Sequence, residues 1–268
     1  MWSMPCRKKT LDGTPADKRV AEKTGIRKNK QRISKAGIKK NECKPWLKKM
    51  WCIQVITEEY RTRMYRILEL YKEDYNPLQP VVCMDEKSKQ FLEDSRKPIK
   101  ARPGSLEKYD YEYKRNGTCN IFVAVVPKGG MHIIKVTDRR TKEDFARFIE
   151  DLIEKHFSNA NFIQIVLDNL NTHFEGSLIE TSGKRKAKKL LKKIRFIYTP
   201  KHASWLNMAE IEINLLDRDC TGGRIESKEK LESEVLIWSK EKNESKTTLN
   251  WKFTRQDADK KLSKHYVA

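Results

Sequence analysis

The sequence predicts an α/β domain in which a mixed β-sheet is flanked by helices, with a small helical region in front of it. Three observations support this class. Five short apolar runs have the length and composition of buried strands. A Pro-Lys-Gly-Gly turn separates the second run from the third and predicts a hairpin. After the third run, helical and strand-like segments alternate, which predicts crossover connections. The predicted strands are residues 81–84, 120–126, 131–136, 163–167 and 194–198.

Helices are predicted where apolar residues recur at helical spacing. In the segment 141–157, five apolar side chains share one face, and Thr141 is a possible cap. Residues 17–24 and 30–38 have the outline of a helix-turn-helix, or equally of a solvated basic hairpin. The other predicted helices are residues 57–75, 183–193, 208–217, 228–242 and 255–264.

This order of elements is that of the ribonuclease H-like fold, in which the first and fourth strands are parallel neighbours. Asp85 ends the first predicted strand and Asp168 ends the fourth, so both carboxylates should reach one edge of the sheet. Glu210 lies early in the helix after the fifth strand and can come over that edge. Glu86 competes with Asp85, and Glu212 with Glu210, because each pair points in two different directions.

Three carboxylates at one place repel one another unless a hard cation is present. Oxygen ligands suit Mg²⁺ or Mn²⁺, and two such ions can promote phosphodiester exchange. The pattern therefore predicts Asp85, Asp168 and Glu210 as catalytic, metal-binding residues for phosphoryl transfer on nucleic acid. The alternative is that each aspartate is only a cap or turn residue after its strand.

The charge balance indicates a polyanionic partner. The 268 residues include 57 Lys and Arg against 37 Asp and Glu, a net charge of +20, which favours phosphate binding. A ribosome-associated or merely soluble basic protein is the alternative. The six cysteines show no metal-site spacing, which favours a reducing, intracellular setting. Without a long apolar run or a secretory signal, no membrane partner is expected and a cytoplasmic location is predicted.

Several residues around the acids are candidates for supporting roles. Asn169, Asn171 and Asn207 are expected to order loops or carboxylates, and His173 to hold a loop or contact phosphate. Trp205 is expected to be a packing anchor. The candidate nucleic-acid contacts, several of which could equally form a solvated surface, are Lys44, Lys48, Lys49, Arg139, Arg140, Lys184, Arg185, Lys186, Lys188, Lys189, Lys201 and His202.

Four segments carry a resemblance to a known family: residues 82–87, 139–145, 167–173 and 199–212. They closely resemble the DDE transposases of bacterial insertion sequences in the IS-six-thirty family, which is related to mariner elements. The resemblance runs from about Leu47 to the C-terminus.

The resemblance implies a ribonuclease H-like catalytic domain with a DDE triad of Asp85, Asp168 and Glu210 on two Mg²⁺ or Mn²⁺ ions. The Leu-Asn-Met-Ala-Glu segment corresponds to Leu-Asn-Pro-Ile-Glu in mariner relatives, which favours Glu210 over Glu212. It also implies cleavage of double-stranded DNA at terminal inverted repeats and joining to target DNA, usually at TA. A homodimer associated with the bacterial nucleoid is expected.

Members of this family usually carry a fuller N-terminal DNA-binding region, so the chain resembles a shortened member. We expect a DNA-binding remnant in residues 1–45 and a helical linker in 46–79. The catalytic domain is expected in residues 80–225, with C-terminal helices packed on it in 226–268. Two alternatives stay open: a truncated relic that binds DNA without cutting it, and a host nuclease acting on RNA–DNA hybrids.

Overall fold

The computed structural model describes residues 55–170 and 173–267. The predicted helices of residues 1–45 lie outside the described residues, as do Lys44, Lys48, Lys49 and Asn171. Those predictions therefore stay predictions.

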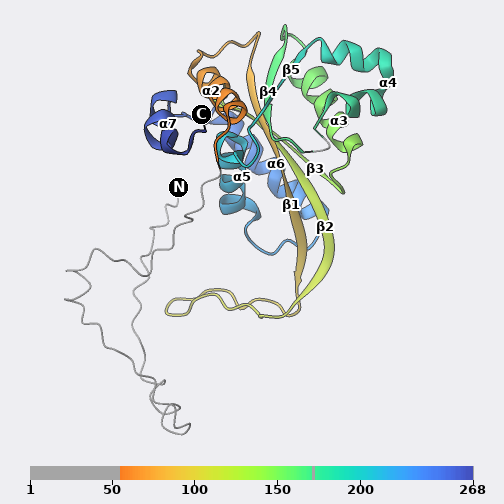
Figure 1. Cartoon of the computed structure of the whole chain (residues 1–268). Coiled ribbons are helices and arrows are strands. Elements are labelled where there is room, and N and C mark those ends of the chain that lie inside the picture. Colours follow the sequence, from red (N-terminus) through yellow and green to blue (C-terminus); the bar gives the residue numbers. More distant parts are fainter. Residues whose placement is uncertain (1–54, 171–172, 268) are drawn as a thin grey trace, which may run out of the picture. The chain divides into compact units, whose positions relative to one another are not determined.

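A five-stranded mixed sheet, in the order β3-β2-β1-β4-β5, forms the centre of the described region (Figure 1). β1 pairs antiparallel with β2, and β2 with β3, whereas β1–β4 and β4–β5 are parallel. This is the ribonuclease H-like topology, and it confirms that the first and fourth strands are parallel neighbours. The strands are β1 (Val81–Asp94), β2 (Tyr113–Val126), β3 (Met131–Thr137), β4 (Ile163–Leu167) and β5 (Ile194–Tyr198).

The first strand is longer than predicted. β1 continues past Asp85 to Asp94, so the expectation that Asp85 ends the strand is wrong. Cys83 is the last residue of β1 that pairs with β4, and beyond it β1 pairs only with β2. β2 likewise begins at Tyr113 rather than at residue 120. Polar side chains suit this two-stranded ribbon because antiparallel strands can keep one face in solvent. Asp85 thus lies two residues beyond the end of the parallel pairing and within the strand.

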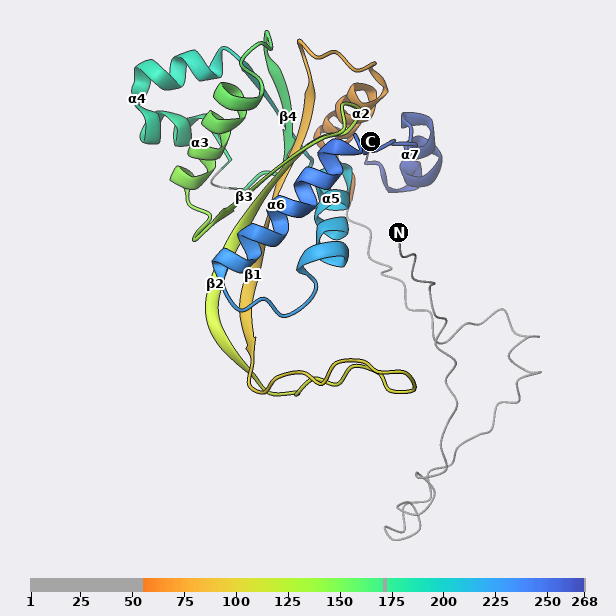
Figure 2. The ribbon, with the colours of Figure 1, turned by 180° about the vertical axis from the view of Figure 1, so that it is seen from behind.

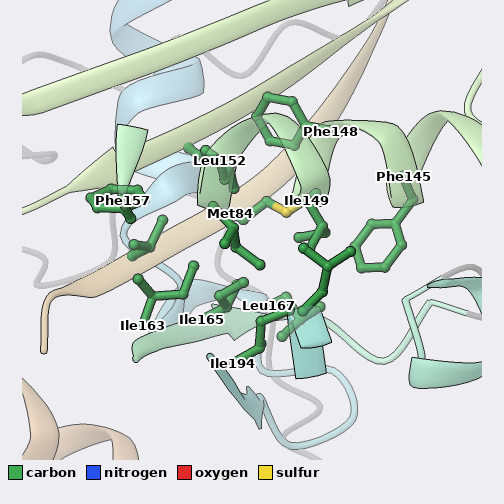
Figure 3. Close-up of a cluster of buried hydrophobic side chains, with 14 of the residues drawn as sticks. Met84, Phe145, Phe148, Ile149, Leu152, Phe157, Ile163, Ile165, Leu167 and Ile194 are labelled. Carbon is green, nitrogen blue, oxygen red and sulfur yellow. The ribbon is translucent and has the colours of Figure 1, made fainter. Parts of the chain in front are cut away.

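Two helices cover one face of the sheet: α3 (Lys142–Asp151) and α4 (Glu175–Leu191). Thr141 caps α3, because its hydroxyl accepts the Asp144 N–H and the Asp144 carboxylate accepts the Thr141 N–H at 2.9 Å. The predicted apolar face of this helix is buried against the sheet. Figure 3 shows part of this core, with the labelled side chains Met84, Phe145, Phe148, Ile149, Leu152, Phe157, Ile163, Ile165, Leu167 and Ile194.

α4 differs from the helix predicted at residues 183–193. It begins at Glu175, and Gly183 interrupts it with φ 75° and ψ 154°. This backbone conformation is left-handed, which glycine adopts without the steric cost of a Cβ atom. The predicted helix start at Gly183 is therefore a kink between two helical stretches.

The opposite face of the sheet carries α2 (Glu58–Lys72), α5 (Ala209–Leu216) and α6 (Lys228–Glu244), and α7 (Arg255–Leu262) packs beside α2. Figure 2 shows α6 lying across the β1–β2–β3 side of the sheet. α2 begins after Thr57, whose hydroxyl accepts the Tyr60 N–H at 3.2 Å. Within the described parts of the chain, no helix combines the length and apolar character needed to cross a membrane.

Candidate active site

Asp85 and Asp168 lie at the same edge of the sheet. The parallel register of β1 and β4 ends with Cys83 opposite Val166, and continuing it brings Asp85 opposite Asp168. Because side chains alternate along a strand, Asp85 shares a face with Cys83, which packs in the cluster that contains the start of α5, the helix that carries Glu210. Asp168 directly follows Leu167, the last residue of β4. The fold therefore directs Asp85 toward the side where Glu210 lies and places Asp168 at the adjoining strand end.

Asp85 experiences the negative charge of the other acids. Burial of its carboxyl, together with the charges of Asp168, Glu210 and Glu86, raises the pKa of Asp85 from 3.8 to about 7. The Glu86 N–H donates to Oδ1 of Asp85 at 2.8 Å and opposes part of this shift. The charges of Asp168 and Glu210 thus act on Asp85, as expected if the three predicted acids are near neighbours.

The buried imidazole of His173 bridges two carboxylates. Its Nδ1 lies 2.8 Å from Oδ1 of Asp168, and its Nε2 lies 2.6 Å from Oε1 of Glu86. Burial alone would lower the pKa of His173, but hydrogen bonds to Asp168 and Glu86 outweigh burial and raise it to about 9. The protonated ring can donate from both nitrogens, which fixes the orientation of Asp168 and occupies Glu86. Of the two adjacent acids on β1, Asp85 is thus the one directed toward the other candidates.

Asn207 fixes the start of the helix that carries Glu210. The buried Asn207 side chain donates from Nδ2 to the Met84 carbonyl at 2.7 Å and accepts the Ala209 N–H at Oδ1, at 3.1 Å. Glu210 is half-buried in the first turn of α5. The loop before α5 is therefore tied to β1 one residue before Asp85, which holds Glu210 beside the sheet.

Glu212, the sequence rival of Glu210, lies in a different environment. Its Oε1 is 2.7 Å from Nδ1 of His132, and both side chains are almost fully buried. Nε2 of His132 contacts the Thr247 carbonyl at 2.9 Å, so this pair links α5 to β3 and to the segment after α6. Glu212 is therefore committed to the interior, and Glu210 is the residue of the two that reaches the acidic site.

The oxygen atoms of the three acids suit a hard divalent cation. Hydrogen bonds engage Oδ1 of Asp85 and Oδ1 of Asp168. Among the described residues, none donates a recorded hydrogen bond to the other oxygen of either aspartate or to the Glu210 carboxylate. Over residues 55–170 and 173–267, no three His, Cys, Asp or Glu side chains form a ready-made metal cage. The carboxylate oxygens present are the ligands that Mg²⁺ or Mn²⁺ prefers. The three side chains would have to move toward one another to bind such ions.

Sequence comparison identifies the family of this site. The sequence model of the DDE superfamily endonucleases matches residues 80–232, which is more than half of the chain and includes all three acids. The chain belongs to this family. A comparison with the sequences of curated proteins returned no match.

Solved structures similar to this DDE endonuclease include complexes of the Mos1 mariner transposase. The paired-end complex with Mn has 16% sequence identity and a TM-score of 0.47, covering 75% of this chain and 62% of that one. The paired-end complex with Mg has 15% identity and a TM-score of 0.47, covering 83% and 68%. The Mos1 strand transfer complex has 15% identity and a TM-score of 0.43, covering 75% and 61%. The match thus spans about three fifths of the length of the first of these chains.

Two arginines lie close to the acidic site of this DDE endonuclease. Burial raises the pKa of Asp168, but His173 and the charge of Arg140 outweigh burial and lower it. Arg63 of α2 donates to Oδ1 of Asn169 at 3.1 Å, and Nδ2 of Asn169 donates to the Thr199 carbonyl. Asn169 therefore ties the ends of β4 and β5 to α2, and positive charge stands beside the carboxylates.

The predicted basic contacts fall into separate groups. Lys201 and His202 are exposed on the loop before α5, where His202 has a left-handed φ of 59°. Arg139 is exposed just before α3. On α4, Lys186 pairs with Glu150 at 3.1 Å, so its charge is partly neutralised. The other predicted α4 residues, which are exposed and form no recorded ion pair among the described residues, are Lys184, Arg185, Lys188 and Lys189.

Sequence reasoning missed several contacts that shape the site. It did not anticipate Arg63 beside Asn169, the Glu86–His173 bridge, or the burial of Glu212 against His132. These partners are 80 or more residues apart in the chain, so no local periodicity pairs them. The only sequence signal was that a charged residue at a strand or helix position with buried neighbours needs a partner.

Proposed function

We propose that this DDE endonuclease is an insertion-sequence transposase of the IS-six-thirty type. It would cut DNA at the ends of its element and join the freed 3′ end to target DNA. The proposal is supported most directly by the placement of Asp85 and Asp168 on neighbouring parallel strands of a ribonuclease H-like sheet and by the effect of the Asp168 and Glu210 charges on Asp85. The net charge of +20 favours a nucleic-acid substrate over a small phosphate ester.

In this proposal each acid has a role in metal binding, and two neighbouring side chains hold the site in place. Asp85 and Asp168 would hold two Mg²⁺ or Mn²⁺ ions, and Glu210 would complete the set. When bound, such ions supply activation of the attacking oxygen and stabilisation of the leaving oxygen. His173 orients the Asp168 carboxylate by its hydrogen bond, and Asn207 holds the start of α5 against β1. Side chains that are already held in place do not have to reorient during the reaction, so no free energy is spent on reorganisation.

The substrate proposed is double-stranded DNA carrying the terminal inverted repeats, together with target DNA. Arg140, Lys201 and the exposed basic residues of α4 would contact phosphates, which hold nucleic acid without regard to sequence. A homodimer at paired ends and a cytoplasmic, nucleoid-associated location belong to the same proposal.

A strand-nicking assay tests this function. With a duplex that contains an element end, the full chain should nick one strand in Mg²⁺ and not in EDTA. Asp85→Asn and Asp168→Asn should abolish nicking, while DNA binding measured in EDTA stays within about twofold, because only metal ligands are removed. Asp138→Asn is the matched control, since Asp138 is exposed and pairs with Lys228 at 2.7 Å.

Full activity of either active-site variant would remove that residue from the proposed triad. Binding without any metal-dependent nicking by the wild-type chain would favour a relic that only occupies DNA. Preferential cleavage of an RNA–DNA hybrid would instead favour a host nuclease.

A further inference from the structure

Trp205 is both supported by other rings and open to solvent. It lies in the turn Ser204–Leu206, directly before α5. Its ring stacks on Trp251 with centroids 6.3 Å apart and an interplanar angle of 21°, and Phe253 meets it edge-on at 5.5 Å. Even so, Trp205 keeps 41% of its surface exposed. The expected packing role is thus only part of its environment, because an indole that is held by neighbouring rings and still partly exposed can stack on a base.

A groove lies near both this indole and the acidic site. It has a volume of about 290 Å³ and lies between the start of α2 and the ends of β4 and β5. Asn169, which follows Asp168 directly, lines the groove, and so does Tyr60, whose side chain lies beside Trp205. The groove therefore reaches Asn169, beside a candidate catalytic carboxylate, and Tyr60, the neighbour of Trp205, whereas Trp205 itself stands just outside its lining.

The charges along this groove suit a phosphate as well as a base. Arg63 and Lys201 line it, and His202 is exposed next to Lys201. Glu59 also lines the groove and pairs with Arg63 at 2.6 Å, so these two charges partly neutralise each other and the phosphate contact falls mainly to Lys201. Aromatic rings interleaved with cationic side chains are the usual composition of a surface that binds single-stranded nucleic acid.

We propose that this groove and the neighbouring Trp205 together bind one unpaired nucleotide of the DNA strand that enters the acidic site. The base stacks on the exposed part of Trp205, and the adjoining phosphate contacts Lys201 in the groove. An unpaired nucleotide fits better than duplex DNA, because the faces of a paired base are covered by its neighbours in the stack. This inference rests on the proposed function, since the groove matters for the strand that is cut.

The test compares two DNA probes bound by the full chain in EDTA, so that no cleavage occurs. One probe is a duplex with a short single-stranded 3′ tail that contains 2-aminopurine, and the other is the blunt duplex of the same sequence. Wild-type protein should quench the 2-aminopurine fluorescence and bind the tailed probe more tightly. Trp205→Ala should weaken binding of the tailed probe about tenfold or more, while binding of the blunt probe changes less than about twofold.

Two further variants keep the test decisive. Trp205→Phe should retain most of the preference for the tailed probe, because phenylalanine still offers a ring face. Tyr75→Ala is the matched control, since Tyr75 is 46% exposed and lies beyond α2, near the turn between β2 and β3. It should leave the affinity for both probes unchanged.

Three results would overturn the proposal. They are no quenching by the wild type, an equal loss of affinity for both probes in Trp205→Ala, or unchanged affinity for the tailed probe in Trp205→Ala. If Trp205→Ala does not fold, the quenching and the Trp205→Phe affinities decide alone. If metal-dependent nicking is absent but the preference for the tailed probe remains, only the proposed transposase function is contradicted. If nicking is intact but the preference for the tailed probe is absent, only the nucleotide site at Trp205 is contradicted.

Discussion

Oε1 of Glu212 lies 2.7 Å from Nδ1 of His132 inside the protein, while Glu210, two residues earlier on α5, stays half-exposed beside the acidic site. Two glutamates on one short helix thus have separate tasks. Residues two apart on a helix differ by roughly 200° in direction, so one faces the interior when the other faces the sheet edge. Glu212 anchors α5 through His132, and this anchoring holds Glu210 in place.

The pair provides a matched test within one helix. Glu210→Gln should abolish metal-dependent nicking with little change in stability, because Glu210 makes no recorded hydrogen bond or ion pair among the described residues. Glu212→Gln should retain nicking but lower the free energy of unfolding by about 1–3 kcal/mol, because buried His132 loses a charged acceptor. Nicking rates and urea unfolding of both variants measure this. The reverse pattern would make Glu212 the third acid.

A second prediction concerns the bridge formed by His173. His173→Ala should lower the free energy of unfolding by about 3–5 kcal/mol, because it leaves the Glu86 carboxylate, only 3% exposed, without its partner. Adding Glu86→Gln to this variant should recover part of the loss, since no unpaired charge is then buried. Urea unfolding of the two single variants and the double variant gives the coupling energy. Losses that simply add would show that the two side chains do not stabilise each other.

The third prediction follows from the pKa of Asp85, which is raised from 3.8 to about 7 in the folded protein. Folding therefore favours the neutral carboxyl, and this contribution to stability is complete below pH 3.8 and lost as the pH rises through about 7. In EDTA, the Tm should fall across this window more steeply for the wild type than for Asp85→Asn. Mg²⁺ should raise the wild-type Tm most at the upper end, where Asp85 is ionised. Superimposable pH profiles of the two proteins in EDTA would contradict the shift.

The sequence predicted the topology well because strand-length apolar runs, a hairpin turn and alternating helices leave few possible arrangements. It correctly made β1 and β4 parallel neighbours, which is what puts Asp85 and Asp168 at one edge, although it ended β1 too early. The charged residues after Asp85 lack the apolar signal of a buried strand, yet they pair with β2 as a partly exposed ribbon. The kink at Gly183 was missed for a similar reason, since a single glycine signals equally a helix boundary and an internal bend.

The last prediction separates basic residues of α4 that are available to DNA from one that is not. Lys188 and Lys189 are exposed, whereas Lys186 pairs with Glu150 at 3.1 Å and with Glu154 at 3.3 Å. The logarithm of the binding constant falls with the logarithm of salt concentration, and each lost phosphate contact makes this negative slope shallower by about 0.9. Lys188→Ala combined with Lys189→Ala should therefore reduce the slope by about 2 and weaken binding of any duplex alike. Lys186→Ala, the matched control, should change the slope by less than half a unit. Fluorescence anisotropy over a salt series measures both, and equal slopes for all three proteins would mean that this face of α4 does not contact DNA.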